Sequence, residues 1–330
     1  MAEFLTFDTD LTAVANAIRA KGGTSAQLIY PNGFVSAIQA IQTGITPKLV
    51  ITTAPGASIT ATPAEGFKVV KGTAGTDGMC TLELPKAGTW HVTAMANSVS
   101  NSQNIVIGTQ SMLLPLYHDT FADNTWEEII AVCRTGIAPD SWAVGDSKSM
   151  TIGGTAYQVD IIGKNHDEYA DGSGTAPLTF QLHDCYSEAK QMYSTNLSGL
   201  GWKNTDMRLT YLPAILALMP AEVKNGIHAV NKKTSEGGNS TTIETVSDTL
   251  FLLSEVEIFG TASSSVAGEG SQYDYYKAGN PKIKKREGVD EFWWERSSAS
   301  GGMFCRVRAN GQAGASNASS SLGVSFAFCF

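Results

Sequence analysis

Charged residues are scarce in this sequence, and those present are mostly acidic. Only 16% of the 330 residues are Asp, Glu, Lys or Arg, and the formal net charge at pH 7 is -8. Proteins that bind nucleic acid or anionic membranes carry stripes of Lys and Arg, which replace the counterions around phosphate groups. The one basic run, PKIKKR at 281–286, is more typical of a solvated loop. The composition therefore excludes a general nucleic-acid binder.

Long apolar runs are also missing. The most apolar stretch, LTYLPAILALMPAEV at 209–223, is broken by Pro213 and Pro220, and it is shorter than the roughly 20 residues that cross a bilayer. The N-terminal MAEFLTFDTD is acidic and has no basic segment followed by an apolar core, so it predicts no secretory signal. We expect a soluble protein that is made in the cytoplasm and does not insert into a membrane.

Cysteine is sparse and scattered, and no CxxC pair occurs, which excludes a zinc ribbon or a thioredoxin-like motif. Buried free thiols are the default interpretation, and a disulfide between Cys305 and Cys329 on neighbouring strands is the alternative. The five cysteines are Cys80, Cys133, Cys185, Cys305 and Cys329.

The motifs of known catalytic machinery are absent: there is no GxSxG, HExxH or P-loop, and no GxGxxG that opens a helix. His166 and His183 lie in polar runs that are the nearest approach to a metal site, but a hydrogen-bonded loop is the simpler interpretation. Glu255 and Glu257 suggest one buried and one solvated carboxylate rather than an acid–base pair. We therefore predict no enzymatic activity, no cofactor and no bound metal ion.

The residues that are abundant predict a β-rich protein of several parts. Its 33 glycines favour short strands and turns, and 42% hydrophobic residues are enough to build cores for about two domains and a small module. Shifts in composition divide the chain into residues 1–45, 46–117 and 118–330.

The first segment, 1–45, predicts two short amphipathic helices. DLTAVANAIRAKGG places Leu11, Val14, Ala15 and Ile18 on one helical face, with Asp10 as the cap and Gly22–Gly23 as the stop. A second helix is expected around 34–41. Two helices of this size cannot bury a core of their own, so we expect them to pack against a partner.

The second segment, 46–117, alternates short β-branched runs with the turn signals APGA, TAGTDG and PKAGT. This spacing is typical of an antiparallel, Ig-like β-sandwich. In the strand TWHVTAM, Trp90, Val92 and Ala94 are expected to face the core, and His91 to face solvent. A spacer role is the favoured interpretation.

The third segment, 118–330, predicts an α+β domain, because its helices and strands are grouped rather than alternating. A helix is expected in TWEEIIAVCRTG, strands in KSMTIGGTAYQVDIIGKN, a second helix in HDCYSEAKQMYS at 183–194, and a strand run in DTLFLLSEVEIFG at 248–260.

The end of the chain combines a plain stretch with aromatic neighbours. Ten of the thirteen residues 309–321 are Ala, Gly or Ser, a composition that is typical of a linker. Strands are nevertheless predicted in EFWWERS, MFCRVRA and GVSFAFCF, with a hairpin turn at Asn310–Gly311. Large side chains are expected to anchor this sheet by burial: Trp293, Phe304, Val324, Phe326 and Phe328.

The positions between these anchors suit either a binding surface on a rigid frame or ordinary solvent-facing residues. The candidate ligand-binding residues are Trp294, Ser298, Ala299, Ser300, Gly301, Gly302, Arg306, Arg308, Gln312, Gly314, Ala315 and Ser316.

Motifs in a fixed order carry a family resemblance over roughly 118–330: TWEEIIAVCRTG, WAVGDSKSMTIGGTAYQVDIIGKNHDEYADGSG, GWKNTDMR, SDTLFLLSEVEIFG, FWWERS and GVSFAFCF. This segment resembles the C-type-lectin-like domain of phage tail proteins, and it is similar to the variable proteins that diversity-generating retroelements diversify. DLTAVANAIRAKGG and YPNGFVSAIQAI resemble a module at the N-termini of phage and prophage tail proteins.

The resemblance implies a receptor-binding protein of the virion tail, made in a bacterial cytoplasm, that binds a host cell-surface protein or glycan. The N-terminal module would attach to other tail proteins, and the chain would form a homo-oligomer, with a trimer as the expected state. In such variable proteins, adenine-directed mutagenesis rewrites positions that match Ser298–Gly302, Arg306, Arg308, Gln312 and Gly314–Ser316.

Two residues depart from the pattern of that mutagenesis. Met303 and Gln312 cannot arise from an Asn codon by changes in its first two bases, so either the template encodes them or these positions are not diversified. A tail-associated glycan hydrolase and a purely structural tail subunit are the alternative functions.

Overall fold

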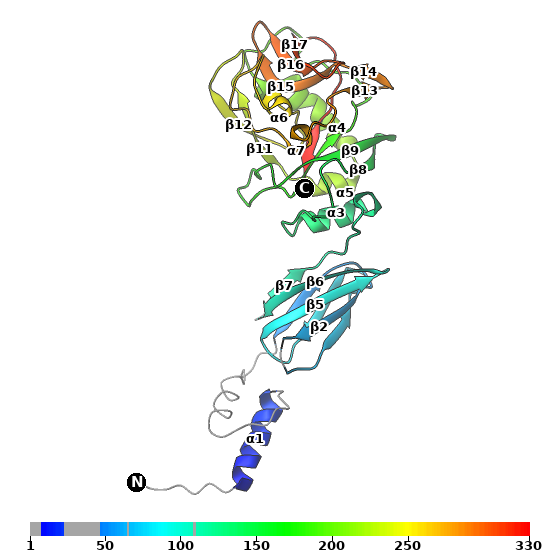
Figure 1. Cartoon of the computed structure of the whole chain (residues 1–330), viewed down its shortest axis with the longest axis vertical. Helices are drawn as coiled ribbons and strands as arrows, with labels where there is room; N and C mark the ends of the chain where they lie inside the picture. The colour runs from blue at the N-terminus through cyan, green and yellow to red at the C-terminus, as the bar shows by residue number, and fades with distance from the viewer. Residues whose placement is uncertain (1–7, 23–46, 65, 108–109) are drawn as a thin grey trace, which may run out of the picture. The chain divides into compact units, whose positions relative to one another are not determined.

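In the computed structural model the chain forms two units, Met1–Tyr117 and His118–Phe330. The structure describes residues 8–22, 47–64, 66–107 and 110–330 (Figure 1). Within these residues, short strands and short helices occur in separate groups along the second unit. The protein therefore has the α+β architecture that the sequence predicts.

The helix of the first segment, α1 (Asp8–Gly22), is longer than predicted and buries a narrower stripe. Because it begins at Asp8, Asp10 lies inside its first turn instead of capping it. Ala15 and Ile18 are buried as predicted, whereas Val14 is 46% exposed. The second predicted helix, around 34–41, lies outside the described residues.

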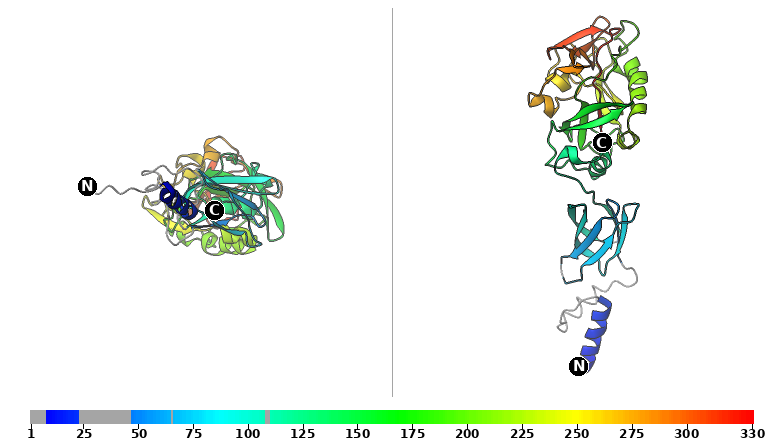
Figure 2. Two further views of the ribbon diagram at one scale, coloured as in Figure 1. Left: turned by 90° about the horizontal axis from the view of Figure 1, so that it is seen from below. Right: turned by 90° about the vertical axis from the view of Figure 1, so that its right-hand side faces the viewer.

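Two small sheets share one core in residues 47–117. The first has the order β4-β1-β7, with β1 and β7 parallel, and the second has the order β3-β2-β5-β6 (Figure 2). The strands are β1 (Lys48–Thr52), β2 (Ser58–Pro63), β3 (Val70–Thr73), β4 (Met79–Glu83), β5 (Gly88–Ala96), β6 (Val99–Ile107) and β7 (Gln110–Leu113).

Side chains alternate along β5 in the predicted sense. Trp90, Val92 and Ala94 are buried in the common core, together with Leu49 of the other sheet. His91 faces solvent, where its Nδ1 lies 2.8 Å from Asn104 Oδ1 of β6. This pattern of one buried and one solvated face is typical of an antiparallel sheet, and the sheet that contains β5 is antiparallel throughout. The prediction of an entirely antiparallel sandwich is wrong at β1 and β7, which are parallel.

The central sheet of the second unit joins the two ends of that unit's chain. Its antiparallel order is β18-β10-β9-β8, and Phe180 of β10 lies opposite Phe328 of β18. Phe121, Trp126 and Phe330 pack around Phe180, with ring centroids 5.4–5.9 Å from it. The strands are β8 (Ser147–Ile152), β9 (Thr155–Lys164), β10 (Leu178–Leu182) and β18 (Ala327–Cys329).

The remaining elements surround this sheet. The helices are the 3-10 helix η1 (Phe121–Asp123), α3 (Trp126–Cys133), the 3-10 helix η2 (Trp202–Asn204), the π-helix η3 (Met207–Tyr211), α4 (Leu212–Leu218), α5 (Ala221–Gly226), α6 (Glu255–Phe259) and α7 (Asp274–Lys277). The strands form the hairpins β11 (Val230–Ser235) with β12 (Ile243–Asp248) and β13 (Lys284–Arg286) with β14 (Val289–Glu291), and the sheet β15 (Trp293–Ala299), β16 (Met303–Val307) and β17 (Ala313–Asn317).

The local predictions for the second unit are partly confirmed. α3 forms with a capping box between Thr125 and Glu128, and β8 and β9 form as predicted. The helix predicted at 183–194 is wrong: the amide groups of Cys185 and Tyr186 donate to Lys285 O and Val324 O, so no helical ladder can form there.

The strand run predicted over 248–260 is also wrong: β12 ends at Asp248, Phe251 makes only an isolated bridge to Ala327, and the end of the segment forms α6. Ser254 caps this helix in a capping box with Glu257, and Gly260 ends it at φ +77°. Glu255 and Glu257 are both buried, so the prediction of one solvated carboxylate is wrong.

Glu257 belongs to a buried ion network that joins four segments of the second unit. Lys232 Nζ of β11 lies 2.6 Å from Asp167 Oδ1 and 2.8 Å from Glu257 Oε1. Arg296 of β15 donates from Nη2 to the same Glu257 oxygen at 2.8 Å. Because each charge has a partner, the network holds β15 against β11 and α6 without leaving an isolated ion.

Candidate functional site

The sheet of β15, β16 and β17 carries most of the predicted ligand-binding positions and divides them between its two faces. Residues directly opposite one another across antiparallel strands share a face. One face carries the rows Trp294–Arg306–Gly314 and Ser298–Phe304–Ser316, and the other carries Cys305–Ala315 and Ala299–Met303–Asn317.

Part of the first face is covered by the segment 190–198. Trp294 Nε1 donates to Lys190 O at 2.8 Å, and Ser198 Oγ donates to Ala299 O at 2.9 Å. Trp294 and Ser298 are consequently buried, and Ala299, whose side chain lies on the other face, is buried as well, all with at most 2% exposed. The assignment of these three as ligand-binding residues is wrong, because a buried side chain offers a ligand no surface.

The loop between β15 and β16 is exposed at Ser300 and Gly301 but restricted at Gly302. A Cβ at Gly302, where φ is +77°, would lie 2.5 Å from Asn196 O. This position requires glycine, so the expectation of a freely replaceable residue is wrong there. The five residues of β16 separate this loop from Arg308, by about 17 Å of extended chain, and Arg306 lies near the far end of the same strand.

Arg306 is the best-anchored candidate at the other end of β16. Its Nε donates to Ser316 Oγ at 2.6 Å and to Ala315 O at 3.3 Å, both on β17. Its guanidinium carbon lies 4.2 Å from the ring centroid of Phe292, which is 38% exposed. Arg306 Nη1 has no hydrogen-bond partner in the described structure.

Arg308 follows on the same face and is exposed. Its Nε donates to Ala313 O at 3.1 Å. A Cβ at Gly314 would lie 2.8 Å from that Nε, so the arginine side chain lies directly against the glycine, which is itself buried. The small residues of β17 therefore provide the space in which both arginines lie across the strand.

The predicted Asn310–Gly311 turn is confirmed, but it connects β16 to β17 and not to GVSFAFCF. Only Ala327–Cys329 of that predicted strand forms one, as β18 of the central sheet. Arg308 N donates to Gln312 O at 2.7 Å, and Gly311 has φ +81°. Gln312 is exposed at this turn. The structure thus brings Arg306, Arg308 and Gln312 together at one end of the sheet.

Sequence reasoning missed Phe292, which supports the guanidinium of Arg306. The available signal was the run Phe292–Trp293–Trp294. Because successive side chains of a strand point to opposite faces, such a run cannot be buried on one face alone.

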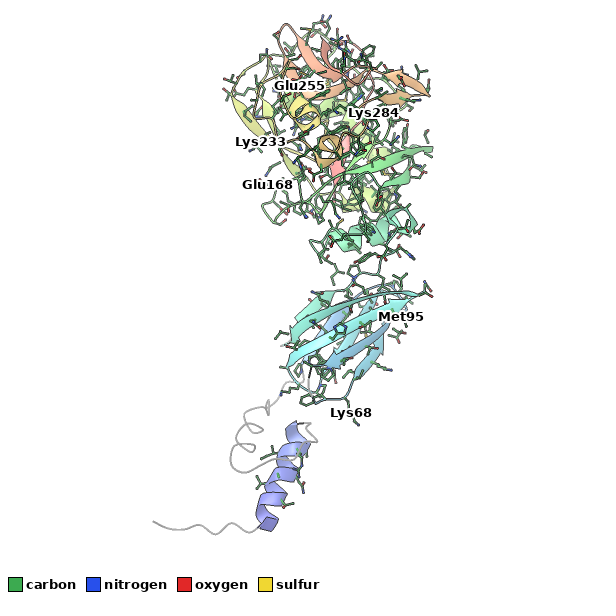
Figure 3. All side chains as sticks on the ribbon, viewed as in Figure 1. Lys68, Met95, Glu168, Lys233, Glu255 and Lys284 are labelled. Carbon is green, nitrogen blue, oxygen red and sulfur yellow. The ribbon has the colours of Figure 1, made fainter. Side chains whose placement is uncertain are left out.

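Beneath the same sheet, Glu295 is buried with both carboxylate oxygens lacking a hydrogen-bond partner among the described residues. Burial first, and then the neighbouring Glu255 and Glu269, raise the pKa of Glu295 well above its usual range. Glu255, on α6 (Figure 3), is different: burial opposes its ionisation, but hydroxyl and amide donors from Ser263, Ser264 and Ser265 outweigh burial and lower its pKa.

A separate hollow of about 220 Å³ lies between η3, α4 and the end of β12, and Arg208, Leu212 and Asp248 are among its lining residues. The Arg208 guanidinium is already engaged, since it donates to Asp248 Oδ1 at 2.6 Å and to the carbonyls of Lys203 and Ser247. This hollow therefore offers a ligand fewer free donors than the Arg306–Arg308 pair does.

The histidines and cysteines have structural surroundings. His166 stacks on Tyr273 at 3.9 Å, and His183 Nδ1 lies 2.8 Å from Asp160 Oδ2. No group of three or more His, Cys, Asp or Glu in the described ranges is arranged to hold a metal ion. All five thiols are free and buried, as predicted, and burial raises the pKa of Cys133 to about 12, which makes it unreactive.

Comparison with known proteins adds one finding. Residues 179–330 match a family described as a domain of unknown function, DUF6273. The match runs from β10 to the end of the chain and includes the whole of β15, β16 and β17. No curated protein matches the chain. Within the described residues, no helix has the length and apolar character needed to cross a membrane.

Proposed function

We propose that this protein is a receptor-binding protein of a phage or prophage tail, which binds a host-surface ligand through a C-type-lectin-like second unit and has no enzymatic activity. The carrying observation is an arginine pair, with Arg308 exposed and Arg306 half-buried, on a sheet whose anchors, such as Trp293 and Phe304, are completely buried. A rigid frame that presents polar side chains is the design of recognition surfaces.

The other parts of the chain have supporting roles in this proposal. Residues 1–45 attach the protein to other tail proteins, and the sandwich of 46–117 is an Ig-like spacer. A homotrimer would present several copies of a shallow site, and linked sites bind a repetitive surface far more tightly than one site does.

Cell binding by the full-length chain tests the proposal. We expect labelled protein to bind host bacteria saturably, and the double variant Arg308→Ala/Gln312→Ala to bind at least about tenfold more weakly with an unchanged melting temperature. Surface side chains of this kind cost little stability when truncated. A control that removes two exposed charges of the sandwich, Lys68→Ala/Lys71→Ala, should bind as the unchanged protein does (Figure 3).

The alternatives give different results in the same system. A glycan hydrolase would release sugar from host glycans, and it needs two carboxylates at a set separation. Glu295 is buried and Glu291 pairs with Arg286 at 2.8 Å, which argues against that pair. A purely structural tail subunit would show no saturable binding to cells, and that result would refute the proposal.

A further inference from the structure

Arg306 and Arg308 carry positive charges that no nearby carboxylate neutralises. Other arginines of the second unit are paired, for example Arg208 with Asp248, Arg286 with Glu291 and Arg296 with Glu257. Within the described structure, neither Arg306 nor Arg308 lies within 4.0 Å of an acidic side chain. The nearest acidic influence on Arg306 is Glu295, which is buried beneath the sheet.

The two charges also act on each other. Burial first, and then the neighbouring Arg308, lower the pKa of Arg306. Arg308 follows directly after β16 and lies against Gly314, the residue opposite Arg306, so the two cations are on the same face and their repulsion is built into the fold. An anion placed between the guanidinium groups would relieve this repulsion, whereas a neutral ligand would not.

The geometry holds both groups ready for such an anion. Each arginine is tied at Nε to β17, Arg306 through Ser316 and Ala315 and Arg308 through Ala313. The terminal Nη1 of Arg306 is buried without a hydrogen-bond partner, and Phe292 supports its guanidinium plane, so the exposed Arg308 is the group that an anion meets first. A guanidinium fixed in this way binds a carboxylate or a phosphate with little further loss of side-chain entropy.

The net negative charge of the whole chain makes the arginine pair necessary for binding a polyanion. With a net charge of -8, the protein repels polyanions at long range, so binding to one requires a local cationic site. A polymer with an anion on each repeat matches several copies of such a site better than a single small anion does.

We infer that Arg306 and Arg308 bind the carboxylate or phosphodiester groups of an anionic cell-surface polysaccharide, with Ser316 and Phe292 positioning Arg306. This inference rests on the proposed function and adds the chemical class of the ligand.

The test uses the full-length chain on immobilised polymers: polygalacturonate for carboxylates, poly(glycerol phosphate) for phosphodiesters, and neutral dextran. We expect binding to at least one anionic polymer and none to dextran, and the polymer that binds identifies the source of the anion. Arg308→Ala should weaken that binding at least tenfold, and Arg306→Lys, which keeps the charge but loses the planar fork, should weaken it less. The matched control Lys68→Ala/Lys71→Ala should leave it unchanged.

Three outcomes would overturn the inference. The first is that no anionic polymer binds. The second is that oligothymidylate, a polyanion without sugar acids or glycerol phosphate, binds as tightly as the best polymer. The third is that Arg308→Ala leaves cell binding and polymer binding both intact while the unchanged protein binds cells. In that third case the proposed function would stand. If the unchanged protein shows no saturable cell binding, both the proposed function and this inference are refuted.

Discussion

Glu295 shows at the scale of one residue how strongly burial acts on a charge. Its neighbours are two further carboxylates, Glu255 and Glu269, and none of the described donors reaches its oxygens. The neutral form is therefore favoured in the folded protein, whereas the unfolded chain ionises near pH 4.5. The stability that depends on the neutral form is complete below that pH and is lost as the pH rises toward the folded-state pKa.

Replacing Glu295→Gln removes this ionisation while keeping the shape of the side chain. We expect the variant to exceed the unchanged protein in free energy of unfolding by about 1–3 kcal/mol at pH 8, because only the unchanged protein must take up a proton on folding or bury a charge there, at roughly 1.4 kcal/mol per unit by which the pKa is raised. At pH 4.5 the difference should nearly vanish. Denaturant titrations at both pH values measure it, and an equal difference at the two would contradict this account.

At the scale of an element, the loop between β15 and β16 shows how the surroundings of a position decide whether it must be glycine. Gly301 and Gly302 both have positive φ, at +69° and +77°, but their surroundings differ. A Cβ at Gly301 would meet only Met303 Cε at 3.8 Å, whereas one at Gly302 would collide with the backbone of Asn196.

This pair of glycines provides a matched experiment. Gly301→Ala should cost about 1 kcal/mol of stability, because alanine is strained in the left-handed region. Gly302→Ala adds a backbone clash and should cost clearly more, about 2–4 kcal/mol in total. Thermal melts of the two variants measure the difference, and equal losses would show that the segment 190–198 moves aside.

Prediction at the scale of elements succeeded where the signal was local. The helix predicted in TWEEIIAVCRTG and the Asn310–Gly311 turn each depend on residues close together in the chain, and both formed. The Ser254–Glu257 capping box was equally local but lay in an apolar run that favoured a strand. The helix predicted at 183–194 was wrong because amide groups of this segment donate to carbonyl oxygens far along the chain. No local sequence pattern indicates such contacts.

At the scale of the whole molecule, the open question is assembly. If the chain is a homotrimer, light scattering of the full-length protein should give about three times the 34.9 kDa of one chain. The weakly apolar α1 cannot bury a core alone, and this motivates the expectation. A stable mass of one chain at micromolar concentration would refute it and would also remove the avidity argument for binding.

Residue types and neighbours along the chain were enough to predict the buried alternation of β5 and the turn at Asn310–Gly311, and the grouping of the predicted elements indicated the α+β class. The tertiary structure was needed to show that Cys305 and Cys329 are free thiols, because a disulfide depends on their distance in space, and to show which candidate positions face solvent. Trp294 and Ser298 look no different from Arg306 in a list of strand residues, yet the segment 190–198 covers two of them and stops short of the third. Coverage is a contact between residues about a hundred positions apart, and a pattern within one strand carries no information about it.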